Sequence, residues 1–265
     1  MRFVRGQRAL AMPLLAGALG AMPFGAAADG GLKTDGLWRG VAGAAASLSS
    51  GNTEASSLSM NLDLVRATEA DKISLVANTI YGRSRIDGVT RTSASKWAAA
   101  GQYDLNLDAQ VYAFGKLALE ADRITGLVWR LSLSAGAGYK LVDQPGAVFN
   151  VFGGAGLSDD RYDSPQTIGD KTAQRFSRAN IVLGEESSHR LTPTVEAKQR
   201  LEVTSGVSGD RADIARLTAG LAVAMNSRLS LTVGLIDTYN SRPPAGVKNN
   251  DLALFTGVAL KFGVP

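Results

Sequence analysis

The chain has 265 residues, of which 45% are hydrophobic and 20% are charged, and it contains no cysteine. This size suits one large all-β domain or two small ones, and the lack of cysteine excludes disulfides, thiolate metal sites and cysteine catalysis. The net charge of +4 depends on three early arginines; without them, 25 basic residues face 24 acidic ones. The composition therefore gives no support for a nucleic-acid partner.

The first 28 residues have the pattern of a secretory signal peptide. Arg2, Arg5 and Arg8 make a positive start, an apolar stretch follows at 9–20, and three alanines at 26–28 supply the small residues before a cleavage site. A membrane anchor is the alternative, but the apolar stretch is too short to span a bilayer as a helix. We expect a cleaved signal peptide at 1–28 and an exported mature domain at 29–265.

The mature chain alternates apolar and polar residues with period two, which is typical of strands whose two faces meet different environments. Over 127–139, for example, apolar residues at the odd positions alternate with polar or small residues at the even ones. Turn signals divide the chain into twelve such segments, at 38–49, 57–68, 72–84, 94–104, 109–121, 127–141, 147–157, 174–186, 194–204, 211–225, 229–240 and 251–262. Most are longer than the roughly five or six residues of globular strands, and about nine to eleven tilted residues cross a bilayer. The pattern predicts an antiparallel transmembrane β-barrel of about twelve strands.

The connections support this prediction because short and long ones alternate. Tight turns are expected at 69–71, 106–108, 143–146 and 226–227, and longer loops at 85–92, 158–172 and 241–250. Outer-membrane barrels have short periplasmic turns and longer outer loops, and an even strand number places both termini on the periplasmic side.

Aromatic residues on the expected lipid face fall into two groups, near the two ends of the strands. Amphipathic rings favour the two bilayer interfaces, so two aromatic girdles are expected, although aromatic residues also favour strands in general. The expected girdle residues are Trp38, Tyr103, Tyr139 and Phe262 at the periplasmic level, and Tyr81, Trp97, Trp129 and Tyr239 at the outer level.

Several stretches resemble the salt-induced outer-membrane proteins of Gram-negative bacteria. The stretches are Trp38-Arg39-Gly40, the segment 48–54 (LSSGNTE), 112–116 (YAFGK), 119–123 (LEADR), 136–139 (GAGY) and 183–186 (LGEE). The resemblance covers essentially the whole mature chain. It implies an outer-membrane β-barrel of unsettled biochemical role and brings no established catalytic or binding residues.

The end of the chain looks like the terminal signal read by the barrel-assembly machinery. Gly257, Leu260 and Phe262 supply its glycine, apolar residue and final aromatic. The chain departs from that signal by continuing for three residues after Phe262; the alternative is an ordinary last strand.

We expect neither catalysis, nor a metal, nor a cofactor. His189 is the single histidine and falls in the expected periplasmic turn 187–193, whereas a lipid hydrolase would need its proton-shuttling histidine at the outer leaflet. Four aspartates in the expected loop 158–172 match no calcium-binding spacing.

The phase of the strands points thirteen charged side chains into the lumen, nine basic and four acidic. They are Asp63, Lys96, Lys116, Glu120, Arg130, Lys140, Arg178, Glu196, Lys198, Arg200, Glu202, Arg216 and Lys261. Paired charges could simply fill the interior, or they could line a narrow aqueous path that favours anions. Twelve strands lie between filled eight-stranded barrels and open sixteen-stranded ones, so the strand number does not decide.

The sequence thus favours a non-enzymatic outer-membrane barrel of the cell envelope, related to salt or osmotic stress, with a filled or narrow lumen. The expected partners are outer-membrane lipids, the barrel-assembly machinery and small solutes or ions. Three alternatives stay open: a narrow anion-preferring channel, an outer-membrane lipid-modifying enzyme, and a soluble periplasmic binder of the lipocalin type.

Overall fold

The computed structural model describes residues 33–49, 54–86, 89–209, 211–243 and 248–263. The expected signal peptide and parts of four connections lie outside these residues. Within them, the chain forms twelve antiparallel strands and no helix of the length and apolarity that a membrane span requires.

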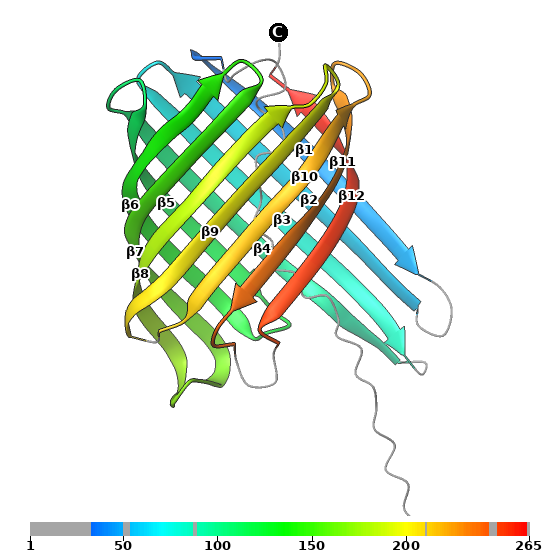
Figure 1. Ribbon diagram of the computed structural model, residues 1–265. Helices are drawn as coiled ribbons and strands as arrows, with labels where there is room; N and C mark the ends of the chain where they lie inside the picture. Colours follow the sequence, from blue (N-terminus) through cyan, green and yellow to red (C-terminus); the bar gives the residue numbers. More distant parts are fainter. Residues whose placement is uncertain (1–32, 50–53, 87–88, 210, 244–247, 264–265) are drawn as a thin grey trace, which may run out of the picture.

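The strands form a closed barrel in which each is paired with its neighbours in the sequence, and β1 pairs with β12 (Figure 1). Their bounds are β1 Asp35–Ser49, β2 Glu54–Thr68, β3 Asp71–Ile86, β4 Val89–Asn106, β5 Val111–Asp122, β6 Leu127–Gln144, β7 Ala147–Ile168, β8 Lys171–Arg190, β9 Val195–Gly209, β10 Asp213–Ala224, β11 Leu229–Asn240 and β12 Asn250–Phe262. The predicted strand number and antiparallel closure are confirmed.

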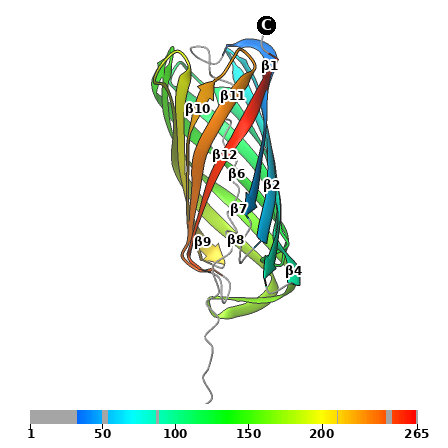
Figure 2. The same cartoon turned by 90° about the vertical axis from the view of Figure 1, so that its right-hand side faces the viewer.

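The barrel has two distinct ends and a flattened cross-section. The first strand begins and the last strand ends at the same opening, which we call the terminal end; the opposite opening is the distal end. The wall is wide in Figure 1 and narrow in Figure 2, so two sides of the wall approach each other across the lumen.

Side chains alternate between the two faces as the sequence predicts. Large apolar residues are exposed on the outward face, for example Leu157 at 62%, Leu183 at 58% and Leu254 at 71%. Inward positions are buried and mostly polar or small. An exposed apolar surface of this extent requires a lipid environment.

The hairpin of β7 and β8 corrects the prediction of a long loop at 158–172. The strands have 22 and 20 residues, so only Gly169 and Asp170 form the turn between them. The polar residues there suggested a loop, but the hairpin simply continues past the wall. Its tip reaches the connection between β11 and β12, because a Cβ at Gly169 would lie 3.4 Å from the Arg242 guanidinium.

Three further expectations need correction. The expected loop at 85–92 is shorter, because β3 extends to Ile86 and β4 begins at Val89. Leu127 was expected on the apolar outward face, but a register shift between Leu127 and Trp129 turns it inward, where it packs with Tyr162, Ile168 and Phe176. His189 lies in β8, opposite Ala147 and Ala197, because the strand continues further than the turn signals indicate.

Candidate functional site

The candidate site is the lumen of the barrel, whose inward face carries a connected set of charged side chains. Buried charges need partners, since an isolated ion in a protein interior costs several kcal/mol. The geometry of these pairs therefore decides whether the lumen is filled or open.

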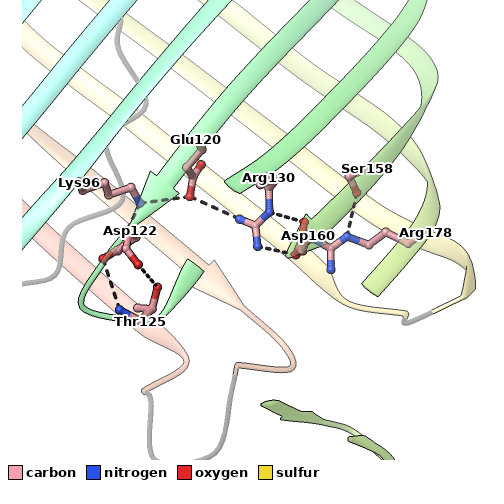
Figure 3. A network of polar contacts seen from close by, with 8 residues as sticks. All are labelled: Lys96, Glu120, Asp122, Thr125, Arg130, Ser158, Asp160 and Arg178. Atoms are coloured by element: carbon pink, nitrogen blue, oxygen red, sulfur yellow. Dashed lines mark hydrogen bonds and ion pairs between the residues drawn. The ribbon is translucent and has the colours of Figure 1, made fainter. Parts of the chain in front are cut away.

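Asp160 organises the distal part of the lumen (Figure 3). It is fully buried and receives two hydrogen bonds from Arg130, from Nε and Nη2, both of 2.7 Å. Arg178 adds a third contact of 2.7 Å through Nη2, and its Nε donates to the Ser158 hydroxyl. One carboxylate thus holds two guanidinium groups from β6 and β8, a short and strong form of ionic hydrogen bonding.

The same network continues to β4 and β5. Glu120 lies 3.4 Å from Arg130 Nη1 and 3.3 Å from Lys96 Nζ (Figure 3). Asp122 is 4.0 Å from the same lysine and accepts the Ile124 backbone N–H in the following turn. Five consecutive strands are therefore linked by charges on the distal inward face.

A second group of charges crosses the lumen. Lys116 Nζ on β5 lies 3.0 Å from Glu202 Oε2 on β9, although three strands separate β5 from β9 around the wall. Arg200 donates to the same glutamate at 2.9 Å and to Glu186 at 2.6 Å. The pair of Lys116 and Glu202 is a bridge across the barrel, which the flattened cross-section permits.

Aromatic rings fill the lumen beside this bridge. Phe114 and Phe152 meet edge to face at 5.9 Å and cluster with Tyr112 and Val182. The ring of Tyr112 lies over Gly138, where any Cβ would collide with it. The Arg200 guanidinium stacks 4.6 Å from the centre of the Phe152 ring, so the charged and aromatic groups form one packed unit.

A cavity of about 250 Å³ remains between these groups. Its lining includes residues of eight strands, β3 to β10, from Lys72 at the terminal side to Arg178 and Ile214 at the distal side. Ionic side chains such as Lys116 and Glu202 share the lining with apolar ones such as Val182, and beside the ionic groups the space suits water and small hydrophilic solutes. The lumen is thus narrow and charged but not completely filled.

The structure places all thirteen of the predicted lumen charges on inward positions. Besides those described above, Lys198 lies 3.3 Å from Glu196, which accepts a hydrogen bond from Ser188, and Lys140 lies 3.8 Å from Asp143 near the terminal opening.

Sequence reasoning missed several inward charges, most of them acidic. Asp104 pairs with Lys72 at 2.9 Å, and Asp122, Asp160 and Glu186 belong to the networks above. Asp122 and Asp160 lie beyond the expected strand ends, so the alternation could not assign them to the inward face. The excess of basic over acidic groups in the lumen is therefore smaller than the sequence suggested.

The expected girdle residues lie on the outward face at the two ends. Near the terminal end, the Tyr103 hydroxyl donates to Asp71 at 3.2 Å and the Tyr139 hydroxyl donates to Gln110 at 2.8 Å. Six of these rings are 39–47% exposed: Trp38, Tyr81, Trp97, Tyr103, Tyr139 and Tyr239. Trp129 is half-buried at the distal level.

The expected assembly residues lie on β12, beside the β1 strand that closes the barrel. Leu260 is 46% exposed and Phe262 is 39% exposed, both on the outward face. Gly257 packs against the backbone of Ala44, where a Cβ would come within 2.8 Å of the carbonyl oxygen.

Among the described residues, no group of three histidine or acidic side chains is placed to hold a metal ion. Asp159 and Asp160 point to opposite faces of β7, so the aspartates of segment 158–172 do not converge. His189 is exposed at the terminal end.

The chain resembles several known proteins. The uncharacterized protein YdiY of Escherichia coli K12 is 29% identical over 197 residues, which cover 74% of this chain and 71% of YdiY. An outer-membrane channel of Pseudomonas putida F1 superposes with a TM-score of 0.50 at 14% identity, over 95% of this chain and 99% of the channel. The NanC porin gives a TM-score of 0.45 at 9% identity, over 86% of this chain and 100% of the porin.

The channel comparison supports the fold, which is that of an outer-membrane β-barrel. A family model described as "Protein of unknown function, DUF481" matches residues 42–262, from the middle of β1 to the end of β12. The chain therefore belongs to the DUF481 family.

Proposed function

We propose that this outer-membrane barrel is a narrow, water-filled channel that admits small hydrophilic solutes and ions. The observation that carries the proposal is the cavity of about 250 Å³ inside the barrel, to which charged residues from both sides of the flattened wall contribute, among them Lys116 and Glu202. A barrel filled for structural purposes alone would need no cavity beside its ion pairs.

The proposed orientation places the terminal end in the periplasm and the distal end outside. Antiparallel outer-membrane barrels with an even strand number have both termini on the periplasmic side. The long β7–β8 hairpin, which extends the wall at the distal end, agrees with this orientation.

The bridge between Lys116 and Glu202 is the proposed constriction. Each partner is only partly exposed, at 24% and 22% of its side chain, and both line the cavity. A solute that passes must move around this pair or separate it. Because acidic groups offset most of the basic ones, we expect only weak preference for anions.

A second candidate is a closed barrel with a mechanical role in the envelope. The same bridge favours it, as does the apolar cluster of Leu127, Tyr162, Ile168 and Phe176 at the distal opening. An enzymatic role has less support, since no described constellation joins a nucleophile to a base.

Conductance of the refolded barrel in a planar bilayer tests the proposal. We expect small, salt-dependent current steps from the wild type and larger steps from the double variant Lys116→Ala and Glu202→Ala. The exchange Glu185→Gln on the outward face serves as the control and should leave the steps unchanged. If neither the wild type nor the double variant gave current steps, the closed barrel would be favoured.

The resemblance to salt-induced proteins supports a further part of the proposal, a role under salt or osmotic stress. A deletion strain should grow more slowly than its parent after a shift to high salt, and the wild-type gene should restore growth. Growth equal to that of the parent at every salt concentration would remove the stress role and leave the channel proposal untouched.

A further inference from the structure

Exposed arginines gather on the outward face just beyond the distal aromatic girdle. They are Arg83 of β3, Arg123 of the turn between β5 and β6, Arg161 of β7 and Arg175 of β8, and we call them the distal arginine rim. Such a position is level with lipid headgroups, because amphipathic rings mark the bilayer interface.

Arg161 and Arg175 oppose each other directly in the ladder of β7 and β8. Like charges in this position repel and destabilise a sheet. Asp159 neutralises only one of them: Arg175 Nε lies 2.9 Å from its Oδ2, and the Ser177 hydroxyl donates to the same oxygen. The pair therefore keeps a net positive charge, and the Arg175 side chain is 71% exposed.

The other two arginines flank Tyr81 of the distal girdle. Arg83 Nε donates to the Tyr81 hydroxyl at 2.8 Å, and its guanidinium lies 5.3 Å from the centre of the ring. The backbone N–H of Arg123 donates to Ser95, the register partner of Tyr81, at 2.9 Å. These contacts hold the Arg83 guanidinium against the tyrosine ring and place the backbone of Arg123 against the neighbouring strand.

The terminal end differs in the sign of its outward charges. There Asp71 receives the Tyr103 hydroxyl, Glu185 receives the Gln199 amide, and Arg66 donates to the Gly36 carbonyl. Mixed charges of this kind select no particular lipid, whereas the four arginines of the distal rim outnumber the neighbouring Asp159 and Asp163.

We propose that the distal arginine rim binds the phosphate groups of the phosphorylated glycolipid that forms the outer leaflet. Guanidinium groups match phosphate oxygens with paired hydrogen bonds, and phosphate would relieve the repulsion between Arg161 and Arg175. The acyl chains would lie against the exposed apolar side chains directly below, such as Leu131 and Leu157. This lipid site rests on the proposed orientation, with the distal end outside, and not on conduction through the lumen.

Binding of purified lipid A to the refolded barrel tests the proposal. The protein is reconstituted in phosphatidylcholine vesicles that contain either bisphosphorylated lipid A or its dephosphorylated form, and the lipid retained after detergent extraction is measured. We expect the wild type to retain the phosphorylated form selectively. Retention should fall at least tenfold in the double variant Arg161→Gln and Arg175→Gln, and it should fall in the wild type as salt screens the charges.

The matched control is Arg66→Gln with Arg228→Gln, which removes the same charge at the terminal end and should retain lipid A as the wild type does. If the first double variant does not fold, Arg123→Gln in its exposed turn should show a severalfold loss. Equal retention of the two lipids by the wild type, or equal loss in the rim and control variants, would overturn the proposal.

Discussion

The ring of Phe262 at the end of β12 lies over Gly40 of β1, its register partner across the seam that closes the barrel. Any Cβ at position 40 would collide with this ring and with the side chain of Leu64. The glycine thus provides a slot that the aromatic ring fills on the outward face.

Replacing Gly40 with valine should weaken the seam. The added side chain must displace Phe262 or the strand, and overpacking of this kind costs about 1–3 kcal/mol. The free energy of unfolding in urea should fall accordingly. The control is Gly115→Val, also on the outward face, where a Cβ would meet nothing within 4 Å. Equal stability of the two variants would show that the slot is unimportant.

Replacing Phe262 with serine should reduce insertion into the outer membrane and expose the chain to periplasmic proteases. The change removes both the ring in the Gly40 slot and the final aromatic of the expected assembly signal. Membrane-inserted protein is measured by immunoblotting of the outer-membrane fraction. Insertion at the wild-type level would remove Phe262 from the signal without affecting the barrel fold.

Asp160→Asn should destabilise the barrel far more than Asp159→Asn, although the two residues are adjacent. The first change leaves Arg130 and Arg178 without their shared carboxylate, and unpairing buried charges costs roughly 3–5 kcal/mol, less where water enters. The second change affects a surface pair with Arg175, which contributes at most about 1 kcal/mol. Urea unfolding of both variants measures the difference, and similar values would mean that the distal network is fully hydrated.

Leu201→Arg should destabilise the barrel more than Thr204→Arg. Leu201 is 36% exposed on the outward face, where an arginine near the bilayer midplane costs roughly 2–4 kcal/mol. Thr204 lines the lumen cavity, in which water can solvate the new charge. Lys198→Leu would be a poor comparison, since it removes the partner of the buried Glu196. A reversed order of stability would mean that the inward and outward faces of β9 are assigned the wrong way round.

Fractionation of cells that make the protein should place it in the outer membrane, with faster gel mobility in unboiled than in boiled samples. Closed barrels resist unfolding by detergent at room temperature, because each backbone donor is paired within the sheet. A soluble periplasmic protein serves as the marker for leakage. Recovery in the soluble fraction without a mobility shift would contradict the membrane location.

Alternation and turn signals together were sufficient to predict the strand number and which face of the wall most side chains occupy. The prediction failed at local irregularities. The register shift near Trp129 turns Leu127 inward, which the alternation does not indicate. The polar residues after Ser158 resemble a loop, although β7 continues through them. The ion pair between Lys116 and Glu202 could not be predicted from the sequence, because it depends on the flattened cross-section of the barrel rather than on the phase of either strand. Each partner was predicted to face the lumen, but nothing in the pattern indicated that they meet.

The seam between β1 and β12 also determines the order in which the chain can fold. Every other ladder joins strands that are consecutive in the sequence and can form as a hairpin, whereas this one joins the two ends of the domain through the short run of pairs from Gly40 with Phe262 to Ala44 with Val258. Closing so long a loop is entropically costly and gains few hydrogen bonds in return. Until the 13 residues of β12 pair with β1, the sheet has two unpaired edges that can bind other chains. Protection from aggregation in the periplasm is therefore gained only with the last strand synthesised.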